Sequence, residues 1–136
     1  MNIVIAGGGA AGFFAAIRAA ETNPAATVTI LERGGEVLGK VRISGGGRCN
    51  VTHACWDPQE LSRHYPRGGK ELLGPFHYFA CGDTVDWFAR RGAELKIEAD
   101  GRMFPVTDRS ETIIECLTGE AARLGVQIIR GQRVEK

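Results

Sequence analysis

The stretch NIVIAGGGAAG, residues 2–12, decides the fold of this chain. Its first part, residues 2–6, is short and apolar, as is typical of a strand inside a parallel sheet. Glycines end this strand, and the alanine-rich residues 10–21 predict a helix that packs closely on the sheet. Residues 27–31 (TVTIL) are rich in β-branched side chains and predict a second strand. The opening of the chain is therefore a strand–helix–strand unit.

The turn between the first strand and the helix has the spacing GxGxxG. In such a turn Gly7 permits the tight bend, Gly9 allows a pyrophosphate to approach the backbone, and Gly12 allows helix and strand to pack closely. The helix start offers N–H groups to the pyrophosphate, and Ala11 is the expected donor. Glu32 ends the second strand, where a carboxylate binds the ribose hydroxyls of an unphosphorylated dinucleotide such as FAD or NAD. Its charge would repel the 2′-phosphate of NADP.

A second glycine run, SGGGRCN at residues 44–50, lies in a segment from 33 to 55 that we expect to be irregular. Consecutive glycines expose backbone N–H groups that suit an anionic group or a flat ring. Arg48 could neutralise a phosphate, and Asn50 could offer a donor and an acceptor to the edge of a flavin. A flexible loop with one solvated arginine explains the residues equally well.

Cys49 lies beside Arg48 and could be a thiolate of low pKa. A buried, small hydrophobic residue is the interpretation that we favour, because most single cysteines serve in that way. Cys49, His53 and Cys55 could also supply three metal ligands, but their spacing fits no standard zinc pattern and a fourth ligand is not evident. We therefore predict no metal site.

The remaining sequence predicts further elements of an α/β fold. Asp57 and Pro58 start a short helix that ends near residue 65, and Asp108 with Glu111 resembles a capping box at the start of another. We expect a Rossmann-like domain with a three-stranded parallel core, surrounding helices and a small β-hairpin. The other expected elements are helices at 70–73 and 83–91, a hairpin of strands 95–98 and 102–105, a helix from 108 to 124 and a strand at 126–130.

The overall charge gives no argument for nucleic acid or a membrane as the partner. The formal net charge is +1, so the whole molecule has no field that would attract nucleic acid or an anionic membrane. Residues 63–70 (RHYPRGGK) form a small basic stretch, which we interpret as a solvated helix end rather than an RNA contact. The four cysteines include no CxxC pair and no secretory signal is evident, so we expect reduced thiols and a cytoplasmic protein.

Four motifs together resemble a known family. They are VIAGGGAAG at residues 4–12, Glu32, the run from Gly39-Lys40 to SGGGRCNVT at 44–52, and GRMFP at 101–105. In these motifs the chain is similar to the flavoproteins that include the aminoacetone oxidase-like and BaiN-like proteins, which are NAD(P)/FAD-dependent oxidoreductases. The resemblance covers essentially the whole chain, and SGGGRCN is its most specific part.

The resemblance implies FAD as the cofactor and assigns it residues. Glu32 is expected at the adenosine ribose, and Val134 at the adenine through its backbone. The pyrophosphate is assigned to Gly7, Gly9, Ala11 and Gly12. The flavin side is assigned to Lys40, Gly47, Arg48, Cys49 and Asn50.

The chain departs from the family pattern at two positions and in length. Val41 stands where the family usually has a second basic residue, and His53 where it usually has Asn. Family members are several times longer, so we expect residues 1–136 to be the N-terminal part of an FAD-binding domain, without the substrate domain and the later flavin-closing segment. The remainder of the parent protein is then the expected partner.

The chemistry that follows is that of a flavin-dependent oxidoreductase, with NAD(P)H as an electron donor and a small-molecule substrate that the sequence does not identify. No catalytic residue can be assigned within this segment. The alternative is a module that binds NAD or an adenine nucleotide without redox turnover.

Overall fold

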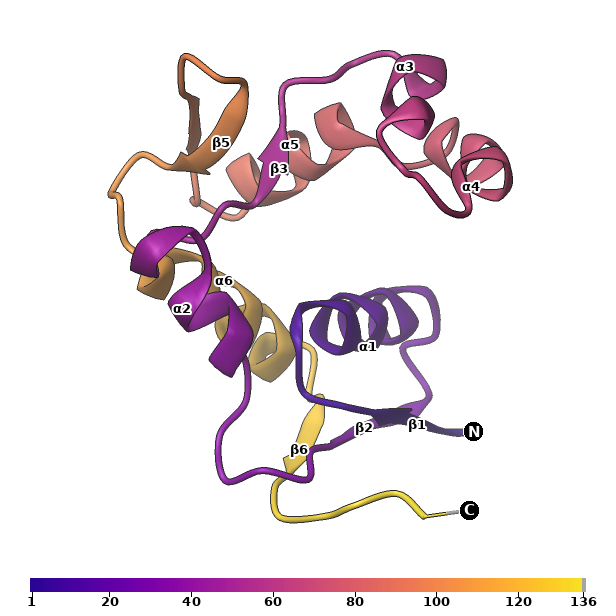
Figure 1. Cartoon of the computed structure of the whole chain (residues 1–136). Helices are drawn as coiled ribbons and strands as arrows, with labels where there is room; N and C mark the ends of the chain where they lie inside the picture. Colours follow the sequence, from indigo (N-terminus) through magenta and orange to yellow (C-terminus); the bar gives the residue numbers. More distant parts are fainter. Residues whose placement is uncertain (136) are drawn as a thin grey trace. The chain divides into compact units, whose positions relative to one another are not determined.

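The computed structural model describes residues 1–135 (Figure 1). Contacts divide the chain into two compact units. The parallel-sheet unit consists of Met1–Cys49 and the chain from Arg109 onward, and the inserted unit consists of Asn50–Asp108. No helix among the described residues is both long enough and apolar enough to cross a membrane.

The parallel-sheet unit contains the predicted three-stranded core. Its strands are β1 (Asn2–Ala6), β2 (Thr27–Leu31) and β6 (Gln127–Ile129), in the order β1-β2-β6. Both pairings are parallel, so each connection crosses over through helical chain. The prediction of a parallel core is confirmed, and with it the Rossmann-like fold class.

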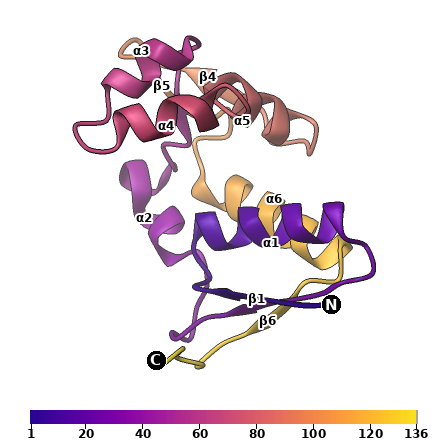
Figure 2. The same ribbon diagram turned by 90° about the vertical axis from the view of Figure 1, so that its right-hand side faces the viewer.

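Two helices cover one face of this sheet. Figure 2 shows α1 (Ala10–Thr22) and α6 (Ser110–Arg123) on the same side of the strands. They bury Phe13, Ile17 and Leu117, with α1 packed on β2 and α6 packed beside α1. Alternate residues of β2 point inward, as a strand with one covered face requires. The core of the parallel-sheet unit is therefore a helix layer on a sheet.

The expectation that residues 33–55 are irregular is wrong in two places. Helix α2 (Gly39–Gly47) begins there, although its backbone is helical only as far as Ile43, and β3 (Thr52–His53) follows. Leu38 and Val41, three positions apart, are both buried, and α2 packs beside α6. This tertiary contact outweighs a low helix propensity that the neighbouring glycines reduce further. The burial of Val41 also explains why an apolar side chain is accommodated at this family departure.

The inserted unit combines three short helices with a small antiparallel sheet. With β4 (Leu95–Ile97) and β5 (Arg102–Pro105), the sheet has the order β3-β5-β4, so the predicted hairpin is present and β3 extends it. The helices are α3 (Pro58–Arg63), α4 (Gly69–Phe76) and α5 (Cys81–Ala89).

The two predicted helix starts have different outcomes. Asp57 caps α3 as expected, because its carboxylate accepts the Glu60 N–H at 2.7 Å. The capping box at Asp108 is wrong: this residue has a φ of 55°, its side chain pairs with Lys96, and α6 begins at Ser110. An ion pair within the inserted unit has therefore replaced the local cap.

Candidate nucleotide-binding site

The glycine turn between β1 and α1 has the geometry that the motif predicts. Gly7 has a φ of +102°, which favours glycine, and its N–H donates to the Leu31 carbonyl at 2.8 Å. A Cβ on Gly12 would lie 1.9 Å from the carbonyl oxygen of Gly7. Glycine at position 12 is therefore a steric requirement of the turn.

The start of α1 is open for an anion. Gly9 is its N-cap, and no side chain caps the helix or places a negative charge in its first turn. A Cβ added to Gly9 would meet nothing within 4 Å. The first N–H groups of a helix have no partners within it and carry its positive dipole end. The residues assigned to the pyrophosphate, including exposed Ala11, thus surround a helix start suited to a phosphate.

Glu32 is bonded to the turn. Its Oε2 accepts the N–H of Gly8 at 2.7 Å, and its Oε1 accepts the N–H of Gly34 at the same distance. These hydrogen bonds, that from Gly34 first, lower the pKa of the Glu32 carboxyl below its usual value. Each carboxylate oxygen has a second lone pair with which it can accept a ribose hydroxyl. Glu32 therefore holds the turn together and remains able to bind a diol.

Gly8 was not among the predicted site residues, although the turn depends on it. Its carbonyl accepts the Leu38 N–H at 2.8 Å, and a Cβ here would lie 2.7 Å from Cγ1 of Val37. The GxGxxG pattern leaves this position unspecified. The signal that could have revealed it is the extra glycine between Gly7 and Gly9, which the GxGxxG spacing does not require.

The second glycine run forms an unusual backbone. Gly45, Gly46 and Gly47 have φ values of 58°, 69° and 86°, and Cys49 is also left-handed at 63°. The Cys49 N–H donates to the Ser44 carbonyl at 2.9 Å, which closes the turn. Cβ atoms added to Gly46 or Gly47 would meet nothing within 4 Å. Successive backbone N–H groups are thus left uncrowded, in the kind of arrangement that binds anions or ring edges.

The surroundings of Cys49 disfavour its thiolate. The residue is buried, and burial raises the pKa of its thiol despite an opposing hydrogen bond with Ser44. The structure therefore favours the small-hydrophobe interpretation over a thiolate. Within residues 1–135, no three His, Cys, Asp or Glu side chains are grouped so that they could hold a metal ion, and the alternative of a metal site has no support.

The other assigned residues are spread over both units. Lys40 is exposed in the first turn of α2, Arg48 is half-buried, and Asn50 is the exposed first residue of the inserted unit. Val134 is also exposed, and it follows a segment bonded to the end of β2: the Gln132 N–H donates to the Glu32 carbonyl at 2.9 Å. Their contacts with a cofactor stay predictions.

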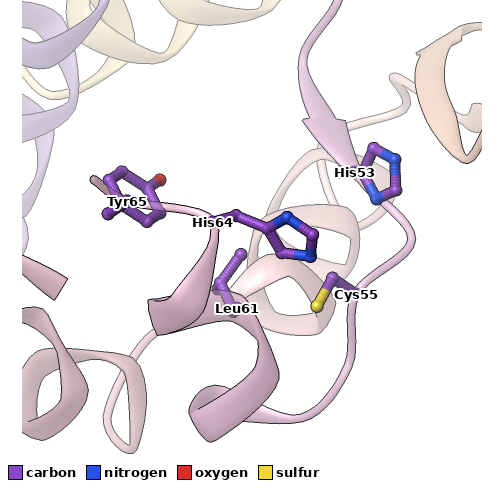
Figure 3. A pocket seen from close by; sticks show the side chains of 5 residues that line it. All are labelled: His53, Cys55, Leu61, His64 and Tyr65. Carbon is purple, nitrogen blue, oxygen red and sulfur yellow. The ribbon is translucent and has the colours of Figure 1, made fainter.

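A separate pocket of about 300 Å³ lies within the inserted unit (Figure 3). The Nε2 atom of His53 lies 3.0 Å from the Asp100 carbonyl oxygen. The centroid of the His53 ring lies 6.4 Å from that of the His64 ring. Burial raises the pKa of the Cys55 thiol, with nearby Glu60 adding to the effect. The pocket is lined by His53, Cys55, Leu61, His64 and Tyr65.

The parallel sheet, the glycine turn and the carboxylate at the end of β2 together define a Rossmann domain of the nucleotide-binding class. The chain belongs to the family described as the HI0933-like protein Rossmann domain, which matches residues 1–136. This membership confirms the resemblance to the BaiN-like proteins.

Three known proteins illustrate the relationship. The chain is 36% identical over 134 residues to the 3-dehydro-bile acid delta(4,6)-reductase of Clostridium scindens, covering 98% of this chain and 32% of the relative. It is 29% identical over 135 residues to the ribosomal RNA dihydrouridine synthase of Haemophilus influenzae, covering 99% and 32%. The crystal structure of THI4 from Thermovibrio ammonificans shares the fold, with a TM-score of 0.58 at 15% identity over 98% of this chain and 43% of that one. The chain thus spans about a third of the length of these curated relatives.

Proposed function

We propose that this chain is the FAD-binding portion of a flavin-dependent reductase, and that the complete protein includes further residues of the kind that its relatives have. The observation that carries the proposal is the glycine turn after β1. It places an open helix start at Gly9 beside the carboxylate of Glu32, which is hydrogen-bonded to the same turn. A pyrophosphate and a ribose are adjacent in FAD, and the two features suit these groups in turn.

The residues fit three parts of FAD. Main-chain N–H groups at the start of α1 would hold the pyrophosphate, while Glu32 would accept the ribose hydroxyls. The uncrowded backbone at Gly46 and Gly47 would lie along the flavin. Any larger residue at these positions would project a Cβ into the space that the flavin would occupy. FAD, when bound, supplies the hydride chemistry that amino-acid side chains lack. The residues of this chain would bind and orient the cofactor.

We infer the substrate class from the names of the relatives. A delta(4,6)-reductase and a dihydrouridine synthase both add two hydrogens to a carbon–carbon double bond. The proposed reaction is therefore reduction of an electron-poor double bond conjugated to a carbonyl group. In the overall balance NAD(P)H gives up one hydride, and the double bond gains that hydride and one proton from water. The four cysteines form no disulfide among the described residues, which suits the reducing cytoplasm in which we place this reaction.

An anaerobic absorbance experiment tests the function. The complete protein, loaded with FAD, is mixed with NADH or NADPH, and the visible flavin bands should fade. An α,β-unsaturated ketone or a uridine-containing RNA is then added, and the bands should return as the substrate gains the mass of two hydrogens. Flavin bands that persist with both donors, or no gain of mass by either substrate, would contradict the proposal.

The alternative, an adenine-nucleotide module without redox turnover, shares the turn and Glu32. It does not account for the second glycine run or for two relatives that are named for reductions. Retention of ADP or NAD by a protein that rejects FAD would favour it.

A further inference from the structure

Two hollows of the inserted unit meet at one aromatic side chain. A groove of about 410 Å³ lies between the end of α3 and the start of α4, and its walls include Arg63, Tyr65, Lys70 and Glu71. Tyr65 also lines the pocket that holds His53 and His64 (Figure 3). Tyr65 thus lines both a groove and a pocket, and we call the surface formed by residues 62–73 around it the α3–α4 face.

The cations of the α3–α4 face are not neutralised by the protein. Arg63, Arg67 and Lys70 are all exposed, and across the described residues no carboxylate pairs with any of them. Three exposed arginines elsewhere do have carboxylate partners nearby in sequence: Arg18 pairs with Glu21, Arg90 with Asp86, and Arg123 with Glu120. A group of free cations in one eight-residue stretch is available for an external anion.

Tyr65 is held as a stacking surface. Its residue is 44% exposed, and its ring centroid lies 5.4 Å from that of Phe76. The loop that follows is closely packed, because a Cβ on Gly69 would lie 2.5 Å from the Ser62 carbonyl oxygen. The Tyr65 ring and the backbone of this loop are therefore held in place by the protein, which reduces the entropy lost on binding.

We propose that the α3–α4 face binds single-stranded or looped RNA, with phosphates on Arg63, Arg67 and Lys70 and a base stacked on Tyr65. Free cations beside an exposed aromatic ring are the combination that binds unpaired nucleotides. Glu71 would repel phosphate, so the chain of phosphates would follow the arginine side of the groove. The choice of RNA rests on the proposed function, since one relative is named for a reaction on ribosomal RNA. It reverses our interpretation of residues 63–70 as a solvated helix end.

A charge comparison tests the phosphate-binding role of the cations. Binding of a short fluorescein-labelled hairpin RNA with uridines in its loop is followed by fluorescence anisotropy over a range of salt concentrations. In R63A/R67A/K70A the slope of log K against log salt should fall by about 2, as expected when three phosphates of a single strand are no longer neutralised by the protein. The control R18A/R90A/R123A removes the same charge from paired arginines and should keep the original slope.

A stacking comparison tests Tyr65. Y65L should weaken RNA binding by about five-fold or more, while Y65F should restore it, because the phenyl ring still stacks. The control is Y78L, which removes a tyrosine that is 89% exposed and whose ring packs on no other aromatic ring in the described part of the chain.

The two proposals fail separately in these experiments. Bound FAD is measured by absorbance for every variant of the complete protein, so a protein without flavin refutes the proposed function whatever the RNA does. The RNA proposal is overturned if the wild type does not bind the hairpin, if both triple variants lose the same slope, or if phosphatidylglycerol vesicles are bound in place of RNA.

Discussion

The carboxylate of Glu32 accepts the backbone N–H of Gly8 at 2.7 Å, which joins the end of β2 to the turn after β1 across 24 positions of sequence. The same carboxylate accepts the Gly34 N–H. One acidic side chain therefore organises the turn before it meets any ligand. Loss of its charge should affect both the stability of the unit and its affinity for a dinucleotide.

The first prediction concerns pH. Because the pKa of Glu32 is lowered in the folded chain from a reference value of 4.5, the carboxylate stabilises the fold above that value. This stabilisation should be lost as the pH falls through the lowered folded-state pKa. E32Q should be less stable than the wild type at neutral pH, and the difference should shrink below the reference value. Urea unfolding of both proteins across this range measures it.

The difference between the two proteins is needed because the pKa of Asp100 is also lowered, mainly by the Arg102 N–H. E32Q leaves that contribution intact, so it cancels in the comparison. A stability gap that stays constant from neutral to acidic pH would show that Glu32 is not the group responsible.

The second prediction separates two glycines of the turn. G12A should lower the free energy of unfolding by about 1–3 kcal/mol or more, because its Cβ would lie 1.9 Å from a backbone oxygen. G9A should change stability by less than about 1 kcal/mol, since its Cβ meets nothing in the protein. G9A should nevertheless bind FAD much more weakly, because that Cβ would occupy the approach of the pyrophosphate.

Thermal unfolding and titration calorimetry with FAD measure the two effects. G35A is the control, because a Cβ there also meets nothing within 4 Å and the residue lies outside the motif. G9A with the affinity of the wild type would contradict the pyrophosphate assignment.

The third prediction concerns the start of α6. Ser110 is 1% exposed, and its hydroxyl donates to the Arg42 carbonyl at 2.9 Å. S110A should destabilise the fold by about 0.5–1.5 kcal/mol, because it removes a hydrogen bond made by a buried hydroxyl. S62A removes an exposed hydroxyl bonded within its own helix and should have a much smaller effect in the same unfolding assay. Equal losses for the two variants would be the contrary result.

The fourth prediction concerns thiol reactivity. Burial raises the pKa of Cys49, so less thiolate is present at neutral pH and the sulfur is shielded from reagents. Alkylation by iodoacetamide, followed by peptide mass spectrometry, should modify half-buried Cys116 before Cys49. Rapid modification of Cys49 in the folded protein would revive the redox alternative.

The sequence predicted the parallel-sheet unit well because its signals are local. Apolar strands, a glycine turn and an alanine-rich helix follow one another, and each has its own short-range cause. The spacing also pointed to Glu32, although not to its bonds with Gly8 and Gly34. Those bonds depend on the loop conformation between β2 and α2, which no residue pattern specifies.

The misses have tertiary causes. Helix α2 is stabilised by burial of Leu38 and Val41 on the helix layer, although its own residues favour a loop. Asp108 pairs with Lys96, twelve positions earlier, and the N-cap of the following helix is Arg109. The free cations at residues 63–70 could be named from sequence, but their lack of carboxylate partners required the structure.

The most direct test is the visible absorbance spectrum of the complete protein, incubated with FAD and then desalted, beside the same spectrum for G9A. We predict twin flavin bands that stay with the wild type and are lost from G9A, with both proteins folded. A folded wild type that is colourless after desalting and releases no FAD on denaturation would contradict the claim that this turn holds the cofactor.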